Sequence, residues 1–186
     1  RRPLDVYMPL GLGTTVYGGP FDAPTRYNGT LMYMSPEIGG VRVSGAVVSK
    51  NNMASKQQNT TELAALYRSG PLVLGLGYTL NAGNTASAVD NFKDRDVLTI
   101  GGRYDFSKLH LGLTYSRVAA PGQAQDSDRY SLGARYPLSN MLALKFGYEF
   151  LEVADRYKSR TVALGAEYRV SKRTMFFSEV GRTQSD

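Results

Sequence analysis

Apolar side chains recur at every second position along most of the chain, beginning near Thr25. In residues 162–170 the even positions are apolar or aromatic, and the odd positions are small or charged. Residues 142–150 repeat the pattern, with Lys145 and Glu149 on the polar side. A period of two is the signature of a β-strand whose two faces meet different surroundings.

Ten segments carry this alternation, and together they predict an all-β chain. They span residues 25–35, 40–50, 60–69, 72–82, 95–105, 109–117, 128–137, 142–152, 158–170 and 174–182. The face opposite the apolar one is small and charged in strand after strand. It offers no aliphatic residues to pack a second sheet, as a soluble sandwich would require.

The connections between these segments alternate in length. The short ones are residues 35–40, 69–71, 106–108, 138–140 and 171–173, and the others are 51–59, 81–94, 118–127 and a briefer one at 153–157. Brief periplasmic turns and longer external loops are typical of an antiparallel up-and-down transmembrane β-barrel. No stretch approaches the roughly 18 apolar residues of a membrane helix, but barrel strands carry no such stretch.

Aromatic residues mark the ends of the predicted strands on the apolar face: Tyr33, Tyr67, Tyr78, Tyr104, Tyr115, Tyr136, Phe150 and Tyr168. Such positions suit the aromatic girdle of a membrane barrel. Ordinary aromatic packing between two sheets is the alternative reading.

Composition narrows the function. The absence of cysteine excludes disulfides, thiolate metal sites and cysteine nucleophiles. The formal charge of +6 comes from basic residues that are scattered along the chain, so nucleic-acid binding is not expected. No cofactor is expected.

Three stretches resemble one known family, the trimeric general porins of Gram-negative bacteria. Residues 26–40 contain RY and, after an alternating strand, SPEIGG; residues 132–139 read LGARYPLS; and residues 164–174 read LGAEYRVSKRT. The last is the most specific, because YxxSKRT recurs at porin turns. With the connection lengths, the likeness covers nearly the whole chain.

The resemblance implies a homotrimer in the outer membrane, in contact with lipid and lipopolysaccharide, that passes small hydrophilic solutes and ions. Residues 1–24 would be a constriction loop folded into the pore. Residues 25–186 would be the wall, supplying the sixth to fifteenth strands of a sixteen-stranded barrel. The chain would then be a partial one, with its export signal elsewhere.

Strand parity and the resemblance together predict the charged residues that line and narrow this pore: Asp5, Asp22, Arg42, Arg68, Arg103, Arg135, Lys145, Glu149, Glu167 and Arg169. Glu62, Asp105 and Glu179 share the same parity. A near balance of charge predicts weak selectivity that leans towards anions. Met32 and Met34 depart from the family, because they place thioethers where porins usually carry polar side chains. They would form a less polar path or fill space beneath the loop.

Besides a pore, two other classes of function stay open, a barrel enzyme and a surface barrel without transport. A protease of the omptin type has ten strands and uses His and Asp near the external rim, but His110 follows a short turn at the opposite end. A barrel phospholipase would need an outward Ser–His pair, whereas His110 has the inward parity. A surface barrel without transport, adhesive or structural, is the third class.

Carboxylates in the external loops are candidates for calcium binding, at Asp126 and Asp128 or at Asp90, Asp94 and Asp96. The spacing of an EF-hand loop is absent, so no sequence motif supports these sites.

Overall fold

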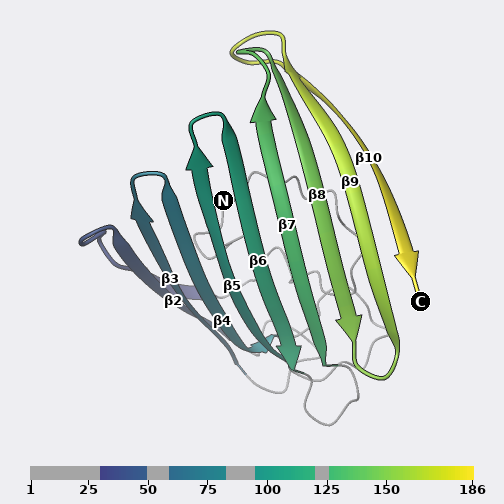
Figure 1. Cartoon of the computed structure of the whole chain (residues 1–186). Coiled ribbons are helices and arrows are strands. Elements are labelled where there is room, and N and C mark those ends of the chain that lie inside the picture. Colours follow the sequence, from purple (N-terminus) through teal and green to yellow (C-terminus); the bar gives the residue numbers. More distant parts are fainter. Residues whose placement is uncertain (1–29, 50–58, 83–94, 120–125) are drawn as a thin grey trace.

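One antiparallel sheet of ten strands makes up the described part of the protein. A computed structural model describes residues 30–49, 59–82, 95–119 and 126–186, and each strand pairs with its neighbours in sequence (Figure 1). The strands are β1 (Thr30–Met34), β2 (Val41–Val48), β3 (Thr60–Ser69), β4 (Leu72–Ala82), β5 (Arg95–Phe106), β6 (Leu109–Ala119), β7 (Ser127–Pro137), β8 (Leu142–Val153), β9 (Tyr157–Arg169) and β10 (Met175–Ser185). The described residues contain no helix with the length and apolar character needed to cross a membrane.

The ten expected strands are confirmed, with every described end within three residues of its expected position. The start of the first segment lies outside the described residues, as does the expected constriction loop at 1–24. The period of two carries this agreement, because each strand must change face at every residue.

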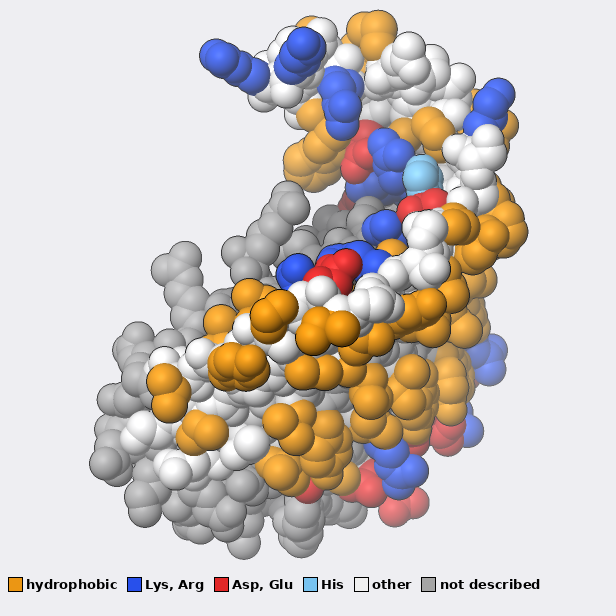
Figure 2. Space-filling model, turned by 90° about the vertical axis from the view of Figure 1, so that its left-hand side faces the viewer, with side chains coloured by type: hydrophobic (Ala, Val, Ile, Leu, Met, Phe, Trp, Pro, Cys, Tyr) orange, Lys and Arg blue, Asp and Glu red, His pale blue; other side chains and the backbone are white. Residues whose placement is uncertain are grey.

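The two faces of the sheet differ in chemistry. We call the face that carries His110 the inner face, and Figure 2 shows its charged atoms and the single His in the hollow of the curved sheet, with apolar atoms outside. The cross-strand register keeps apolar residues of neighbouring strands on the outer face, as in the row Leu113, Leu132, Tyr148 and Val162. Because the pairs stay in step, the difference between the faces persists across the sheet.

Apolar side chains are exposed and polar ones are buried in this sheet, the reverse of the arrangement in a soluble protein. On the outer face Leu63, Leu113 and Leu164 are 55%, 58% and 57% exposed, whereas Thr114 on the inner face is 1% exposed. A soluble fold would bury these leucines in a core. An apolar outer surface and a polar interior are what a barrel wall in lipid requires.

Aromatic side chains line both ends of the outer face. Near the long connections Tyr115 and Tyr130 have ring centroids 5.0 Å apart, and Phe150 follows at 6.3 Å from Tyr130. Near the short turns Tyr104 and Phe106 lie 4.4 Å apart. All eight expected aromatic residues fall on the outer face by register, which gives the apolar band an aromatic border at each end.

Short turns are set by local chemistry. Gly40 has φ +79°, and a Cβ there would lie 2.2 Å from the Arg68 carbonyl oxygen, so only glycine fits. Two later turns use a serine hydroxyl instead. Ser139 accepts hydrogen bonds from the backbone N–H of Leu142 at 3.0 Å, and Ser171 plays the same part in the β9–β10 turn.

Small residues form one row across the inner face. Gly112, Gly133, Gly147, Ala163 and Gly181 are successive cross-strand partners from β6 to β10. This row leaves the concave side of the sheet uncrowded where it curves.

The inner face is less uniformly polar than the sequence suggests. Leu66 and Val73 lie on it, as do Leu151 and Val153 near the long connections. The expectation of a face without aliphatic residues was therefore wrong at these places. Alternation within one strand does not reveal which short apolar runs also continue onto the second face.

We expect Leu164→Arg to lower the free energy of unfolding by about 2–4 kcal/mol, because it puts a charge on the lipid-facing side near mid-strand. Ala163→Arg is the matched control, since its neighbours on the inner face are Gly147 and Gly181. It should cost no more than about 1 kcal/mol. Urea titration of the full-length protein in phospholipid vesicles measures the free energy of unfolding of both variants. Equal losses of stability would contradict this assignment of the two faces.

Candidate functional site: the charged inner face

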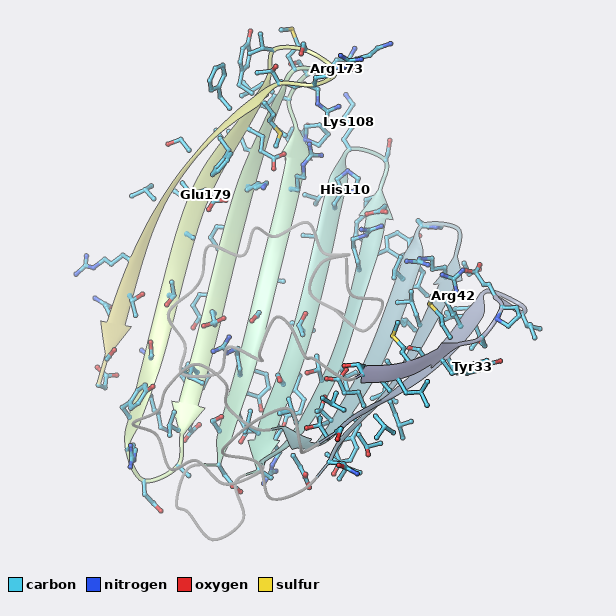
Figure 3. All side chains as sticks on the ribbon, turned by 180° about the vertical axis from the view of Figure 1, so that it is seen from behind. Tyr33, Arg42, Lys108, His110, Arg173 and Glu179 are labelled. Carbon is cyan, nitrogen blue, oxygen red and sulfur yellow. The ribbon has the colours of Figure 1, made fainter. Side chains whose placement is uncertain are left out.

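An ionic row crosses the inner face near the short turns. Asp105, His110, Arg135 and Lys145 are successive cross-strand partners on β5 to β8. His110 Nδ1 lies 2.7 Å from Asp105 Oδ1, and Arg103 Nη2 lies 3.1 Å from the other oxygen of this carboxylate. Figure 3 shows His110 near the short-turn end, below Lys108. The strands thus bring one imidazole and one guanidinium group to the Asp105 carboxylate.

Glu167 on β9 joins two basic residues from neighbouring strands. Its carboxylate lies 3.2 Å from Arg135 Nε, and Lys145 Nζ is in direct contact with its other oxygen. The side chains of Lys145 and Glu167 are only 13% and 15% exposed. The two cations attract this mostly buried carboxylate strongly, because salt screens buried ion pairs less than exposed ones.

A third group lies closer to the long connections. Glu149 lies 3.6 Å from Arg129 Nη1 and accepts a hydrogen bond from the Ser131 hydroxyl at 3.4 Å. Glu149 is among the residues predicted from the sequence, whereas Arg129 is not. The available signal was parity, since Arg129 stands six residues before Arg135 on the same strand and must share its face.

Arg42 and Arg68 meet at the other side of the sheet. Both approach Glu37 in the β1–β2 turn, Arg42 at 3.3 Å and Arg68 at 3.9 Å. Figure 3 labels Arg42 and the neighbouring Tyr33, which the register places on opposite faces of the sheet. One carboxylate therefore serves two guanidinium groups.

Of the other predicted residues, Arg169 lies on the inner face opposite Met175. Glu179 also faces inward, and its side chain lies over Gly165, where an added Cβ would come within 2.8 Å of the Glu179 Cγ. Asp5 and Asp22 lie outside the described residues. Their predicted role at a constriction stays a prediction.

Hydroxyl groups fill much of the inner face between these clusters. Thr99 and Ser116 are hydrogen-bonded at 3.1 Å, and Thr161 and Thr183 at 2.9 Å. Together with the ion pairs they make a polar wall that water can hydrate and with which ions can interact.

Cations outnumber carboxylates among the described inward side chains of the strands, seven to five. The cations are Arg42, Arg68, Arg103, Arg129, Arg135, Lys145 and Arg169, and the carboxylates are Glu62, Asp105, Glu149, Glu167 and Glu179.

The carboxylates considered for calcium have other contacts. Asp126 lies 3.8 Å from Arg117, and Asp128 accepts a hydrogen bond from the Tyr115 hydroxyl. Asp96 accepts one from Tyr78 at 3.5 Å. Within the described ranges no group of three potential ligands is suited to a metal ion, and Asp90 and Asp94 lie beyond those ranges.

We expect Glu167→Gln to lower the free energy of unfolding by roughly 2–3 kcal/mol, because it leaves Arg135 and Lys145 without their shared carboxylate. Glu152→Gln is the control. Its pair with Lys158 at 2.7 Å lies on the outer rim with side chains 43% and 54% exposed, so the change should cost less than about 1 kcal/mol. Urea unfolding in detergent micelles separates the two, and indistinguishable midpoints would contradict the structural weight given to Glu167.

Comparison with known proteins identifies the family. A family model described as Gram-negative porin matches residues 5–186. No curated relative matches the chain.

Solved outer-membrane proteins share the fold. OmpT of Vibrio cholerae in a form lacking loop L8 superposes with a TM-score of 0.66 at 19% identity, over 84% of this chain and 57% of that one. A porin structure gives 0.66 at 17%, over 83% and 56%. OmpF of Salmonella typhi in complex with daunomycin gives 0.54 at 13%, over 85% and 62%. The chain spans little more than half the length of these proteins. It belongs to the Gram-negative porin family and is a β-barrel protein of the bacterial outer membrane.

Proposed function

We propose that the protein forms a water-filled channel through which small hydrophilic solutes and ions diffuse passively. The observation that carries this proposal is the inner face, where ion pairs and hydroxyl groups cover a concave wall whose outer side is apolar. A wall of this kind needs water on one side and hydrocarbon on the other.

The width of such a channel depends on how many strands close the barrel. Ten strands alone would enclose a largely filled interior, whereas about sixteen leave an aqueous lumen. The outer-membrane proteins that it superposes on are longer, since the chain covers only 57% of the Vibrio cholerae protein and 56% of the porin. We therefore place the ten strands in a sixteen-stranded barrel, as its sixth to fifteenth strands.

Selectivity would come from the charges on the wall. Seven inward cations face five carboxylates, and most of the carboxylates are held by a basic partner. Paired charges partly cancel at a distance, so the preference for anions should be weak. Asp5 and Asp22, on a loop formed by residues 1–24, would add negative charge opposite the wall arginines.

Assembly and surroundings follow the family. A homotrimer is the proposed state, with outer-membrane lipid and lipopolysaccharide against the apolar outer face. Ion pairs on the outer rim, such as Glu152 with Lys158, would lie at the level of the headgroups.

An enzymatic role is not proposed, although His110 and Asp105 form a His–Asp contact. Asp105 also binds Arg103, and the pair lies beside a short turn instead of among the long connections. A protease of the omptin type would need its His and Asp at the external rim. The contact is better explained as one link of the ionic row.

In planar bilayers in a KCl gradient, we expect the full-length protein to open in large discrete steps, grouped in threes for a trimer. The reversal potential should show a modest preference for chloride, because inward cations are in excess. The intact mass, measured beside it, should be well above that of 186 residues. A silent bilayer would favour a structural or adhesive barrel.

Incubation with a set of fluorogenic peptides should give no hydrolysis above buffer. His110→Gln should leave this background unchanged, because the imidazole acts in the wall and not on a substrate. Hydrolysis by the wild type that this variant lacks would establish the protease reading instead.

A further inference from the structure

The inner face of β1 to β4 differs from the rest of the wall. Met32 and Met34 point inward by register and are 47% and 43% exposed. Leu66 on β3 and Val73 on β4 lie on the same face, and Val73 is packed there with 8% exposure. We call these four residues the apolar patch. Thioethers and aliphatic side chains attract the apolar part of a solute, and sulfur also makes favourable contacts with aromatic rings.

Arginines border the apolar patch on its short-turn side. Val73 has Arg68 as its direct partner on β3 and Arg103 on β5. Arg42 is the direct partner of Leu66. Met34 pairs with Ser44, two residues from Arg42, so the thioether and the guanidinium are diagonal neighbours within reach of long side chains.

Two of these arginines, Arg42 and Arg68, carry a surplus of positive charge. Arg42 and Arg68 share the single carboxylate of Glu37, at 3.3 and 3.9 Å. The side chains of Arg42 and Arg68 are 39% and 46% exposed. Both guanidinium groups are therefore placed to receive a second carboxylate, and an arginine fork suits that geometry.

We propose that the apolar patch and Arg42 with Arg68 form a binding station for small amphiphilic carboxylates, in which the ring or alkyl body lies on Met32 and Met34 and the carboxylate on the arginines. This inference rests on the proposed channel and adds a substrate class to it. Exposed thioethers beside surplus guanidinium groups match a solute with one apolar and one anionic end. They match a sugar or a simple ion less well.

The proposed binding site can be tested in the full-length protein by measuring how strongly added solutes block the current through single channels. Benzoate has both features, acetate has only the charge, and benzyl alcohol has only the ring. In KCl we expect benzoate to halve the conductance at a concentration about tenfold below that of either of the others, as expected for partial burial of one ring.

Two double variants separate the contributions. Met32→Thr with Met34→Thr should bring benzoate to within about twofold of acetate, and threonine suits the strand. Arg42→Gln with Arg68→Gln should weaken block by both carboxylates and leave benzyl alcohol unchanged. Met141→Thr, on the β7–β8 turn, makes the same side-chain change outside the patch and should behave as the wild type. A far-UV circular dichroism spectrum and a trimer fraction like those of the wild type verify that each variant folds.

The outcomes distinguish this inference from the channel itself. A conducting wild type blocked equally by benzoate and acetate overturns the station and leaves the channel standing. The same holds if benzyl alcohol blocks as well as benzoate, or if the methionine variant keeps the benzoate preference. A wild type without conductance overturns both proposals.

Discussion

Backbone hydrogen bonding is the constraint on which the rest of this structure depends. In the hydrocarbon core of a membrane an N–H or C=O group without a partner costs several kcal/mol, so every spanning strand must be paired along its length. The nine strand pairs meet this need with an antiparallel ladder that runs from β1 to β10. Proline, which cannot donate to a ladder, is kept to its margins: Pro71 lies in a turn and Pro137 is the last residue of β7.

Once the ladder is fixed, each residue has only two directions to point, and the surroundings decide which residue types are tolerated in each. At the β8–β9 end, charge on the outer face lies at the rim, where Glu152 and Lys158 pair beyond the aromatic row, whereas on β10 Arg182 faces outward opposite Val162. On the inner face, charges are held by partners one or two strands away, as with Arg135 on β7 and Glu167 on β9. Like charges that meet across strands, such as Arg135 and Lys145, are tolerated because Glu167 lies between them.

The strands could be predicted from the sequence because a period of two is local information, readable within ten residues. Contacts across strands are not local. Arg135 meets Glu167, which is 32 residues further along the chain, and only the register decides that it does. Arg129 was missed although its parity was readable, and the inward aliphatic side chains Leu66 and Val73 were missed in the same way, since Leu66 has the parity of Arg68 and Val73 is the partner of Arg68.

The row from Gly112 to Gly181 has a consequence for anything that travels along the wall. On one side of it lie Asp105, His110, Arg135 and Lys145, and on the other lie Thr114, Ser131 and Thr161. Successive rows on one face are about 7 Å apart, so two polar belts are separated by a strip of nearly bare backbone roughly 14 Å across. In the proposed channel, an ion leaving the first belt meets only glycine and alanine in this row of the described strands before it reaches the second. The wall of the proposed channel therefore offers ions two separate polar belts, with an interval of small side chains between them.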